Sequence, residues 1–315
     1  MTPPAPADPF APCHLCPRRC GVDRHQTLGI CREPAAIRLS HALPHFGEEP
    51  CFTGTRGSGA FFLSGCSCHC IFCQNWQISS PPPGTPPLPT LSAEEFHARA
   101  LDLIARGVHN LNFVTPTHVW PLVRDLCLRL RSEGVALPVI LNSSGYELPE
   151  HIPAQAAFAD IFLPDFKFAS PDLARTVMGD PAYPDFALQS LRRMVEAKGF
   201  LFPFDPTGRE PAREGVLVRH LLLPGHLDDT RRVLSILRDE FGRHLPLSLM
   251  SQYLPVPPVA HRPPFDRPPT PEEYREAVAF AERLDFDNLF IQPPADTTGY
   301  LPDFTRPAPF PSNPS

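Results

Sequence analysis

The sequence predicts an α/β protein in which short buried strands alternate with amphipathic helices. Seven apolar runs bounded by Gly, Pro or Asn have the length of strands and lie at 60–63, 110–114, 137–141, 158–163, 216–223, 247–250 and 287–291. Repeated βα units favour parallel strands joined by right-handed crossovers. We therefore expect a partial (β/α)6 barrel with a small cysteine-rich N-terminal extension, although the pattern alone does not separate a barrel from an open doubly wound sheet.

Helices are predicted between these strands by apolar stripes and by capping signals. Ser92 and Glu95 form a capping box, and the stripe that follows ends at Gly107. Later in the chain, Thr270 and Glu273 flank a first-turn proline and begin another helix. In either α/β arrangement, ligands bind at the carboxyl ends of the strands, which is where we look for a site.

Composition limits the organisation of the chain and the classes of partner. We expect a cysteine-rich segment over 1–50, a catalytic core over 51–295 and a proline-rich tail over 296–315, because the 44 prolines gather in loops and at the ends. The formal net charge of −6 and the lack of a basic block argue against nucleic acid. With no signal peptide and no long apolar stretch, we expect no membrane partner and a cytoplasmic location, where clustered cysteines favour metals over disulfides.

A group of cysteines directly follows the first predicted strand. Cys66, Cys70 and Cys73 are spaced C-x3-C-x2-C and can place three thiolates on one metal centre. Three thiolates leave one coordination position open, as catalytic metal sites do, whereas a closed structural site uses four ligands. The alternative is a zinc loop with Cys68 or His69 as fourth ligand. We expect Cys68 to be a bystander, because ligands two residues apart would strain the loop.

This cysteine spacing resembles the signature of radical S-adenosylmethionine enzymes. Over about 50–292 the chain also resembles uncharacterised homologues of the pyruvate formate-lyase activating enzyme, in stretches such as LNSSGYE, LPDFKF and VLVRHLLLPG. The resemblance implies a 4Fe-4S cluster and S-adenosylmethionine, cleaved reductively to a deoxyadenosyl radical that abstracts hydrogen. It further implies a protein substrate of the glycyl-radical enzyme type and a reducing partner such as flavodoxin or ferredoxin.

The resemblance also implies which residues contact the cofactor. Phe72, before the third cysteine, matches an aromatic residue near the adenine. Asp165 and Lys167 match an Asp-x-Lys pair, in which the carboxylate can accept ribose hydroxyls and the lysine can neutralise a carboxylate. A surface ion pair beside a strand is the plain alternative for this pair.

Three further strand ends are candidates for cofactor contact. Arg219 interrupts an apolar run, where a buried guanidinium needs a carboxylate or another fixed acceptor, and its family counterpart lies near the cofactor. Asn142 stands where activating enzymes often carry Asp, so a cation held there would lose a charged ligand. Thr115 and Thr117 lie where those enzymes have Gly-Gly-Glu, so a threonine would have to substitute for that motif.

A second cysteine group precedes the predicted core. The spacing C-x2-C-x3-C-x10-C matches no common ferredoxin pattern and predicts a metal site, zinc or a second iron–sulfur cluster, on Cys13, Cys16, Cys20 and Cys31. Cys51 is a candidate fifth ligand, and Cys127 lies on a helical apolar stripe, as a core residue would.

Two other functional hypotheses remain at this point. The same radical chemistry could act on a small molecule or on another protein, since a fold does not specify a substrate. A non-catalytic zinc-binding interaction module, with both cysteine groups as structural zinc sites, would instead hold zinc and no iron.

Overall fold

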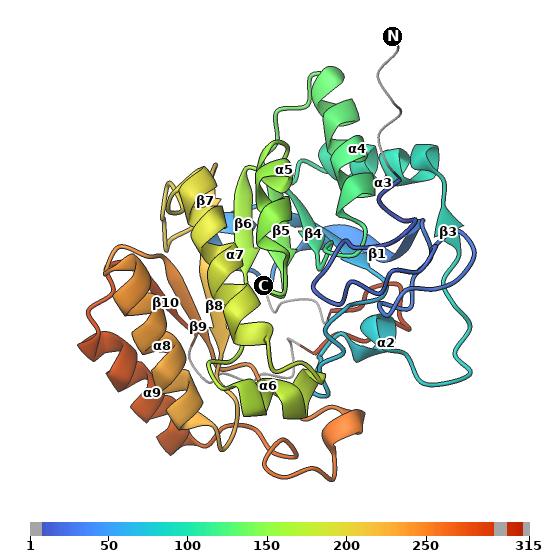
Figure 1. The fold of residues 1–315 in the computed structure, drawn as a ribbon. Helices are drawn as coiled ribbons and strands as arrows, with labels where there is room; N and C mark the ends of the chain where they lie inside the picture. Colours follow the sequence, from blue (N-terminus) through green and yellow to red (C-terminus); the bar gives the residue numbers. More distant parts are fainter. Residues whose placement is uncertain (1–7, 293–300, 311–315) are drawn as a thin grey trace.

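The computed structural model describes residues 8–292 and 301–310, and it confirms the alternation of strands and helices (Figure 1). Its strands are β1 (Ile37–His45), β2 (Ser58–Leu63), β3 (Thr90–Leu91), β4 (Leu111–Val114), β5 (Val139–Ser143), β6 (Ile161–Pro164), β7 (Gly215–Val216), β8 (Val218–Leu221), β9 (Leu247–Met250) and β10 (Leu289–Ile291). Of the tail predicted over 296–315, only 301–310 lies within the described residues.

The parallel strands follow one another in chain order. The larger sheet has the order β3-β1-β2-β4-β5-β6-β7, and a smaller one has the order β10-β9-β8. A bridge between Asp165 and Arg219 joins the end of β6 to β8, so the two sheets continue as one curved wall. This order has no reversal of the doubly wound kind. The partial barrel is therefore confirmed, with seven main parallel strands among the described residues (β2, β4, β5, β6, β8, β9 and β10) rather than six.

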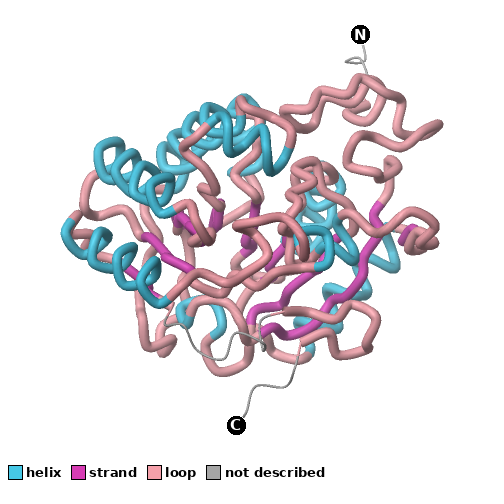
Figure 2. The backbone as a smooth tube through the Cα atoms, turned by 90° about the horizontal axis from the view of Figure 1, so that it is seen from below, coloured by secondary structure: helices cyan, strands magenta, loops and turns pink. Residues whose placement is uncertain are grey.

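Helices cover the outer face of the curved wall (Figure 2). The helices of the described residues are α1 (Pro50–Thr53), α2 (Trp76–Ser79), α3 (Ala93–Ala105), α4 (Trp120–Ser132), α5 (Ile152–Ala156), α6 (Pro171–Met178), α7 (Tyr183–Lys198), α8 (Leu227–Phe241) and α9 (Pro271–Arg283), with short 3-10 turns at Pro149–His151 and Pro257–Val259. Both predicted capping boxes are present, at Ser92 with Glu95 and at Thr270 with Glu273. Among the described residues, no helix is long and apolar enough to cross a membrane.

The N-terminal segment contributes to the sheet as well as to the cysteine-rich extension. β1 lies within the predicted 1–50 segment, yet it pairs antiparallel with β2 from His45–Ser58 to Leu39–Leu63. Most of its side chains are only half buried, so the strand lacks the clear alternation by which a strand is predicted from sequence. The barrel wall consequently begins before residue 50.

A short segment after β1 closes the amino ends of the strands. In α1, Cys51 and Phe52 are fully buried and pack in an apolar cluster with Ile140, Ile161 and Leu217. This packing fixes the position of the two residues that precede the helix, Glu48 and Glu49, beneath the barrel interior.

The C-terminal residues 301–310 pack against the inner face of β1 and β2. The rings of Phe304 and Phe310 lie 5.4 and 5.1 Å from that of Phe62, and the Phe304 amide donates to Gln77 Oε1 at 2.8 Å. Because this segment and β10 both line the barrel interior, they bound the open side of the partial barrel.

Candidate functional site

A cavity of about 1290 Å3 occupies the barrel at the carboxyl ends of the strands. All but one of the residues that the sequence places at the cluster or the cofactor line it, the exception being Thr117. The residues of this set that line the cavity are Cys66, Cys70, Phe72, Cys73, Thr115, Asn142, Asp165, Lys167 and Arg219. They meet here because parallel strands end at the same rim, although the residues are scattered over more than 150 positions of the sequence.

The cysteine loop leaves β2 at a turn that needs glycine. Gly65 has φ +77°, and a Cβ there would lie 2.3 Å from the side chain of Glu33, so the loop packs closely against the N-terminal segment. Cys68 also lines the cavity, and its sulfur donates to Ser144 Oγ at 3.1 Å. Ser79 donates its hydroxyl to Cys73 Sγ at 3.2 Å. Hydrogen bonds with Ser144, directly after β5, and with Ser79 in α2 therefore orient the sulfurs of Cys68 and Cys73.

His69, the other candidate fourth ligand, is hydrogen-bonded through both ring nitrogens. Nε2 lies 2.7 Å from the Ile30 carbonyl oxygen, and Nδ1 lies 2.8 Å from Ser80 Oγ. A carbonyl oxygen only accepts, so Nε2 carries the proton and donates. Neither nitrogen is left free for a metal in this arrangement.

Phe72 forms an apolar part of the cavity wall. Its ring contacts three other aromatic rings, with centroid distances of 5.8 Å to Tyr253 and 6.2 Å to both Phe168 and Phe265. Aromatic pairs at these distances fix one another's orientation. The loop therefore presents its four cysteines, Cys68 included, beside a rigid flat surface.

Asp165 and Lys167 form an ion pair at the end of β6. Burial opposes the charge on Lys167, but Asp165 and the nearby Cys70 more than offset that effect and raise its pKa above the usual value. The ammonium group is thus held in its charged form next to the cysteine loop. The pair faces the cavity, so the plain alternative of a surface ion pair does not describe it.

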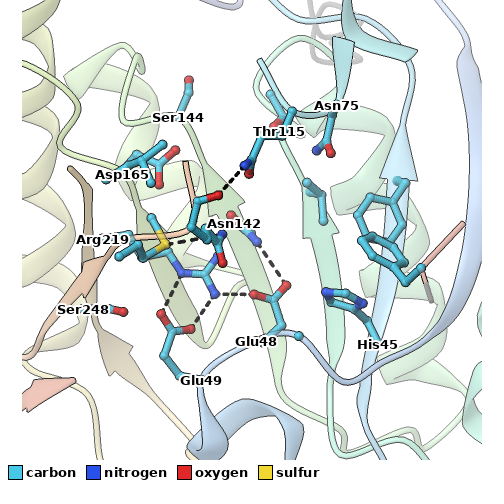
Figure 3. Close-up of a pocket in the computed structure, with 18 of the residues that line it drawn as sticks. His45, Glu48, Glu49, Asn75, Thr115, Asn142, Ser144, Asp165, Arg219 and Ser248 are labelled. Carbon is cyan, nitrogen blue, oxygen red and sulfur yellow. Dashed lines mark hydrogen bonds and ion pairs between the residues drawn. The ribbon is translucent and has the colours of Figure 1, made fainter. Parts of the chain in front are cut away.

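Arg219 lies between two carboxylates on the cavity floor (Figure 3). Its Nε donates to Glu49 Oε1 at 2.9 Å, and its Nη2 contacts both Glu49 and Glu48. The prediction that a buried guanidinium there needs a carboxylate is confirmed. These acids engage Nε and Nη2 of the guanidinium, and its predicted contact with the cofactor remains a prediction.

Glu48 connects this ion pair to the ends of β4 and β5. Its Oε1 accepts from Asn112 Nδ2 at 2.8 Å and lies 3.4 Å from Asn142 Nδ2. Burial opposes its ionisation, but Arg219 and then His45 more than offset this, so the pKa of Glu48 is below its usual value. Two carboxylates and one guanidinium leave a net charge of −1 on the floor.

The strand ends of β4 and β5 are joined by backbone and side-chain bonds. The Thr115 amide donates to the Asn142 carbonyl oxygen at 2.7 Å, and both residues line the cavity. Thr117 is instead buried behind the wall, where its hydroxyl donates to Glu147. Burial raises the pKa of Glu147 to about 7.

The end of β9 divides its residues between cavity and core. Gln252 lines the cavity, whereas Ser251 donates to the Gln292 carbonyl oxygen at 2.8 Å and Tyr253 to that of Phe265 at 2.6 Å. His220, next to Arg219, points to the other side of its strand and lies 2.7 Å from the Phe166 carbonyl oxygen. Ser251, Tyr253 and His220 therefore stabilise the strand ends through hydrogen bonds to backbone carbonyl oxygens.

The N-terminal cysteines lie near one another, against the cysteine loop of residues 65–73, whereas Cys51 and Cys127 are buried in apolar surroundings elsewhere. The Cys66 amide donates to the Cys31 carbonyl oxygen at 3.3 Å. Within the described residues, no three His, Cys, Asp or Glu side chains are gathered closely enough to hold a single metal ion. A cluster differs from a single ion in this respect, because its thiolates bind different irons.

Glu48 and Glu49 are the site residues that sequence reasoning missed. Both lie in the stretch EEPCF, and a pair of acids directly before a proline and two apolar residues was the available signal. The buried cation expected at Arg219 called for such a partner, but the sequence does not reveal which of the chain's 34 acidic residues it is.

Comparison with known proteins finds relatives of unknown activity. No protein-family model matches the chain. The uncharacterised protein MJ0674 of Methanocaldococcus jannaschii is 28% identical over 293 residues, which cover 89% of this chain and 77% of the relative. A second protein of that organism, MJ0808, is 26% identical over 282 residues, covering 84% and 75%.

Solved structures overlap the barrel in part. Methylornithine synthase (PylB) aligns with TM-score 0.48 and 15% identity over 72% of this chain and 60% of its own. HydG, a maturase of the FeFe-hydrogenase, aligns with TM-score 0.49 and 14% identity over 72% of this chain and 49% of its own. Streptococcus suis SuiB bound to S-adenosylmethionine aligns with TM-score 0.45 and 9% identity over 72% of this chain and 48% of its own. The chain thus spans about half to three fifths of their lengths, and we infer its activity from its own site.

Proposed function

We propose that this chain is a radical S-adenosylmethionine enzyme that holds a 4Fe-4S cluster on Cys66, Cys70 and Cys73. The observation that carries the proposal is a loop whose Cys66, Cys70 and Cys73 thiols line a large cavity. Both candidates for a fourth ligand also lie on this loop, but Cys68 donates to Ser144 and His69 donates to the Ile30 carbonyl oxygen. Such a donor set closes three corners of a cluster and leaves one iron for the cofactor.

The residues present fit this group chemically. Thiolates are the ligands that iron–sulfur clusters use. Burial raises the pKa of the Cys73 thiol above its ordinary value, and the nearby positive charge of Lys167 partly opposes that rise. When bound, the cluster supplies the electron that cleaves the cofactor's carbon–sulfur bond and so generates a deoxyadenosyl radical that abstracts hydrogen.

The remaining cavity residues would bind and orient the cofactor. Phe72 offers a flat apolar surface to the adenine, and Asp165 and Lys167 offer an acceptor for ribose hydroxyls and a cation for a carboxylate. The floor, with its net charge of −1 from Glu48, Glu49 and Arg219, favours the positively charged sulfonium form of the cofactor over neutral products. These residues would thus bind the adenine, the ribose, the carboxylate and the sulfonium of the cofactor.

For the hydrogen donor, we extend the proposal to a glycine of a partner glycyl-radical enzyme, with flavodoxin or ferredoxin as reductant. The resemblance of stretches such as LNSSGYE and LPDFKF to those of activating-enzyme homologues supports this choice. Incubation with a candidate glycyl-radical enzyme, followed by electron paramagnetic resonance, tests it. A doublet that depends on S-adenosylmethionine supports the partner, and deoxyadenosine formed without a protein radical points to another substrate.

The experiment for the reaction class is anaerobic reconstitution with iron and sulfide, reduction with dithionite, and assay of deoxyadenosine from S-adenosylmethionine. We expect product from the wild type, and none from the triple variant Cys66→Ala, Cys70→Ala, Cys73→Ala. The control is Cys127→Ala, which removes a buried thiol outside the cavity. Zinc-loaded protein that takes up no iron and forms no deoxyadenosine would overturn the proposal in favour of a non-catalytic zinc module.

A further inference from the structure

The N-terminal cysteines surround a buried arginine. Arg24 is 1% exposed, and its Nη1 lies 3.8 Å from Cys13 Sγ. Its Cδ and the sulfur of Cys31 both lie within 3.4 Å of the position of a Cβ on Gly29, so Cys31 is a second neighbour. Cys20 Sγ lies 4.0 Å from the Cys13 carbonyl oxygen. The Cys13 thiol therefore contacts the guanidinium, Cys31 lies beside the Arg24 side chain, and Cys20 lies next to Cys13.

Arg24 has hydrogen-bond partners but little compensating charge. Its guanidinium donates to carbonyl oxygens, to Glu33 at 3.1 Å and Pro34 at 2.6 Å, and also to His118. The carboxylate of Glu33 is close enough to interact with its charge, but that carboxylate accepts a hydrogen bond from Ser64 at 2.8 Å and pairs with Arg38 at 3.6 Å. One carboxylate for two arginines leaves an excess positive charge in a buried place, which is costly unless an anion is present.

We propose that Cys13, Cys16, Cys20 and Cys31 hold a closed four-thiolate metal centre whose negative charge Arg24 compensates. Four thiolates around a divalent zinc ion carry a net charge of −2, and a four-thiolate iron–sulfur cluster is likewise anionic. The shared chemistry is a thiophilic metal bound by four sulfurs. In the part of the chain that the structure describes, no three of these sulfurs converge on a single ion, so metal binding requires them to move closer together.

The centre lies against the backbone of the catalytic loop. Besides the bond from the Cys66 amide to Cys31, Arg18 Nε donates to the Ser67 carbonyl oxygen at 3.0 Å and its Nη2 to that of Met178 at 2.6 Å. The centre would thus hold residues 65–67 from outside the cavity. This bracing role rests on the proposed function, whereas the metal site itself does not.

The test counts metal and sulfide in the variant Cys66→Ala, Cys70→Ala, Cys73→Ala, which lacks the proposed catalytic cluster. We expect the anaerobically purified protein to hold about one zinc per chain, or iron with a matching amount of acid-labile sulfide. The first result identifies the centre as a zinc site and the second as an iron–sulfur cluster. Adding Cys13→Ser and Cys31→Ser should remove that metal, and adding Cys127→Ser in their place should leave it. A variant without metal, or one that keeps it after the serine changes, overturns the proposal.

Thiol alkylation gives a second readout that does not depend on variant folding. In the wild type, iodoacetamide should label the N-terminal thiols only after a strong chelator has removed the metal, as mass spectrometry of the peptides would show. Labelling that is complete without chelator, or a disulfide among these cysteines, would contradict the metal site. For the bracing role, Cys13→Ser with Cys31→Ser should lose the absorbance of a reconstituted catalytic cluster several-fold faster than Cys127→Ser, and equal rates would rule it out.

Discussion

Arg219 and Arg24 are both buried, at 9% and 1% exposure, but their surroundings differ in charge. Arg219 lies between the carboxylates of Glu48 and Glu49, so its region carries one excess negative charge. Arg24 donates mainly to carbonyl oxygens beside thiols, and its region carries one excess positive charge. The first arginine is neutralised by the chain itself, and the second needs thiolates that a metal would stabilise. The charge around a buried arginine thus indicates which ligand charge its site can accommodate.

The largest effect is expected from removing the neutralised arginine. Arg219→Met leaves two buried carboxylates without their cation and should lower the free energy of unfolding by about 3 to 5 kcal/mol. Urea denaturation measures this, with Arg193→Met as a control at an exposed ion pair, where a loss below about 0.5 kcal/mol is expected. Similar losses in the two variants would show that the floor does not depend on charge pairing.

A smaller effect is expected at Glu147, a buried acid without a cationic partner among its hydrogen bonds. Its pKa of about 7 in the folded protein exceeds its ordinary value of 4.5. Between these values the unfolded chain ionises while the folded protein keeps the proton, so stability falls as pH rises through this window. Below pH 4.5 Glu147 causes no loss of stability, and above pH 7 the loss is constant, at about 3 kcal/mol.

The Glu147→Gln variant cannot ionise at this position. Its free energy of unfolding, relative to that of the wild type, should therefore increase by about 3 kcal/mol between pH 4 and pH 7.5. Thermal or urea unfolding over this range measures the difference. Glu196→Gln, at an exposed position, should track the wild type throughout. A Glu147→Gln curve parallel to that of the wild type would show that Glu147 titrates normally in the folded protein.

The next effect concerns the arginine without a carboxylate of its own. If Arg24 compensates a thiolate centre, Arg24→Met should weaken zinc binding by about 10- to 100-fold, as changes next to metal ligands do. Competition with a chromophoric chelator, in the background that lacks Cys66, Cys70 and Cys73, measures the affinity. Arg24→Lys keeps the charge and should lie closer to the wild type. Equal weakening by Met and Lys would assign the effect to lost hydrogen bonds.

The smallest effect is expected at Glu48. Glu48→Gln leaves Arg219 paired with Glu49, so the free energy of unfolding should change by less than about 1 kcal/mol. Urea denaturation beside Arg219→Met gives the contrast directly. A loss as large as that of Arg219→Met would mean that the floor requires both acids for stability.

The sequence predicted the upper part of the site well and its floor poorly. Residues such as Asp165 and Thr115 follow predicted parallel strands, and that topology alone brings them to one rim. Glu48 and Glu49 have no such periodic context, because their place depends on Cys51 and Phe52 packing among residues far along the chain. β1 was missed for a related reason, since its half-buried side chains give no clear alternation. Local pattern thus predicts strand ends, and long-range packing decides what lies beneath them.

Deoxyadenosine formation by two single variants tests the central claim most directly. Cys70→Ala removes a proposed cluster ligand, whereas Cys68→Ala removes a neighbouring buried thiol that donates to Ser144. After identical anaerobic reconstitution and reduction with dithionite, Cys68→Ala should still cleave S-adenosylmethionine and Cys70→Ala should not. Cleavage that survives in Cys70→Ala, or that is lost equally in both, would contradict a three-cysteine cluster on this loop.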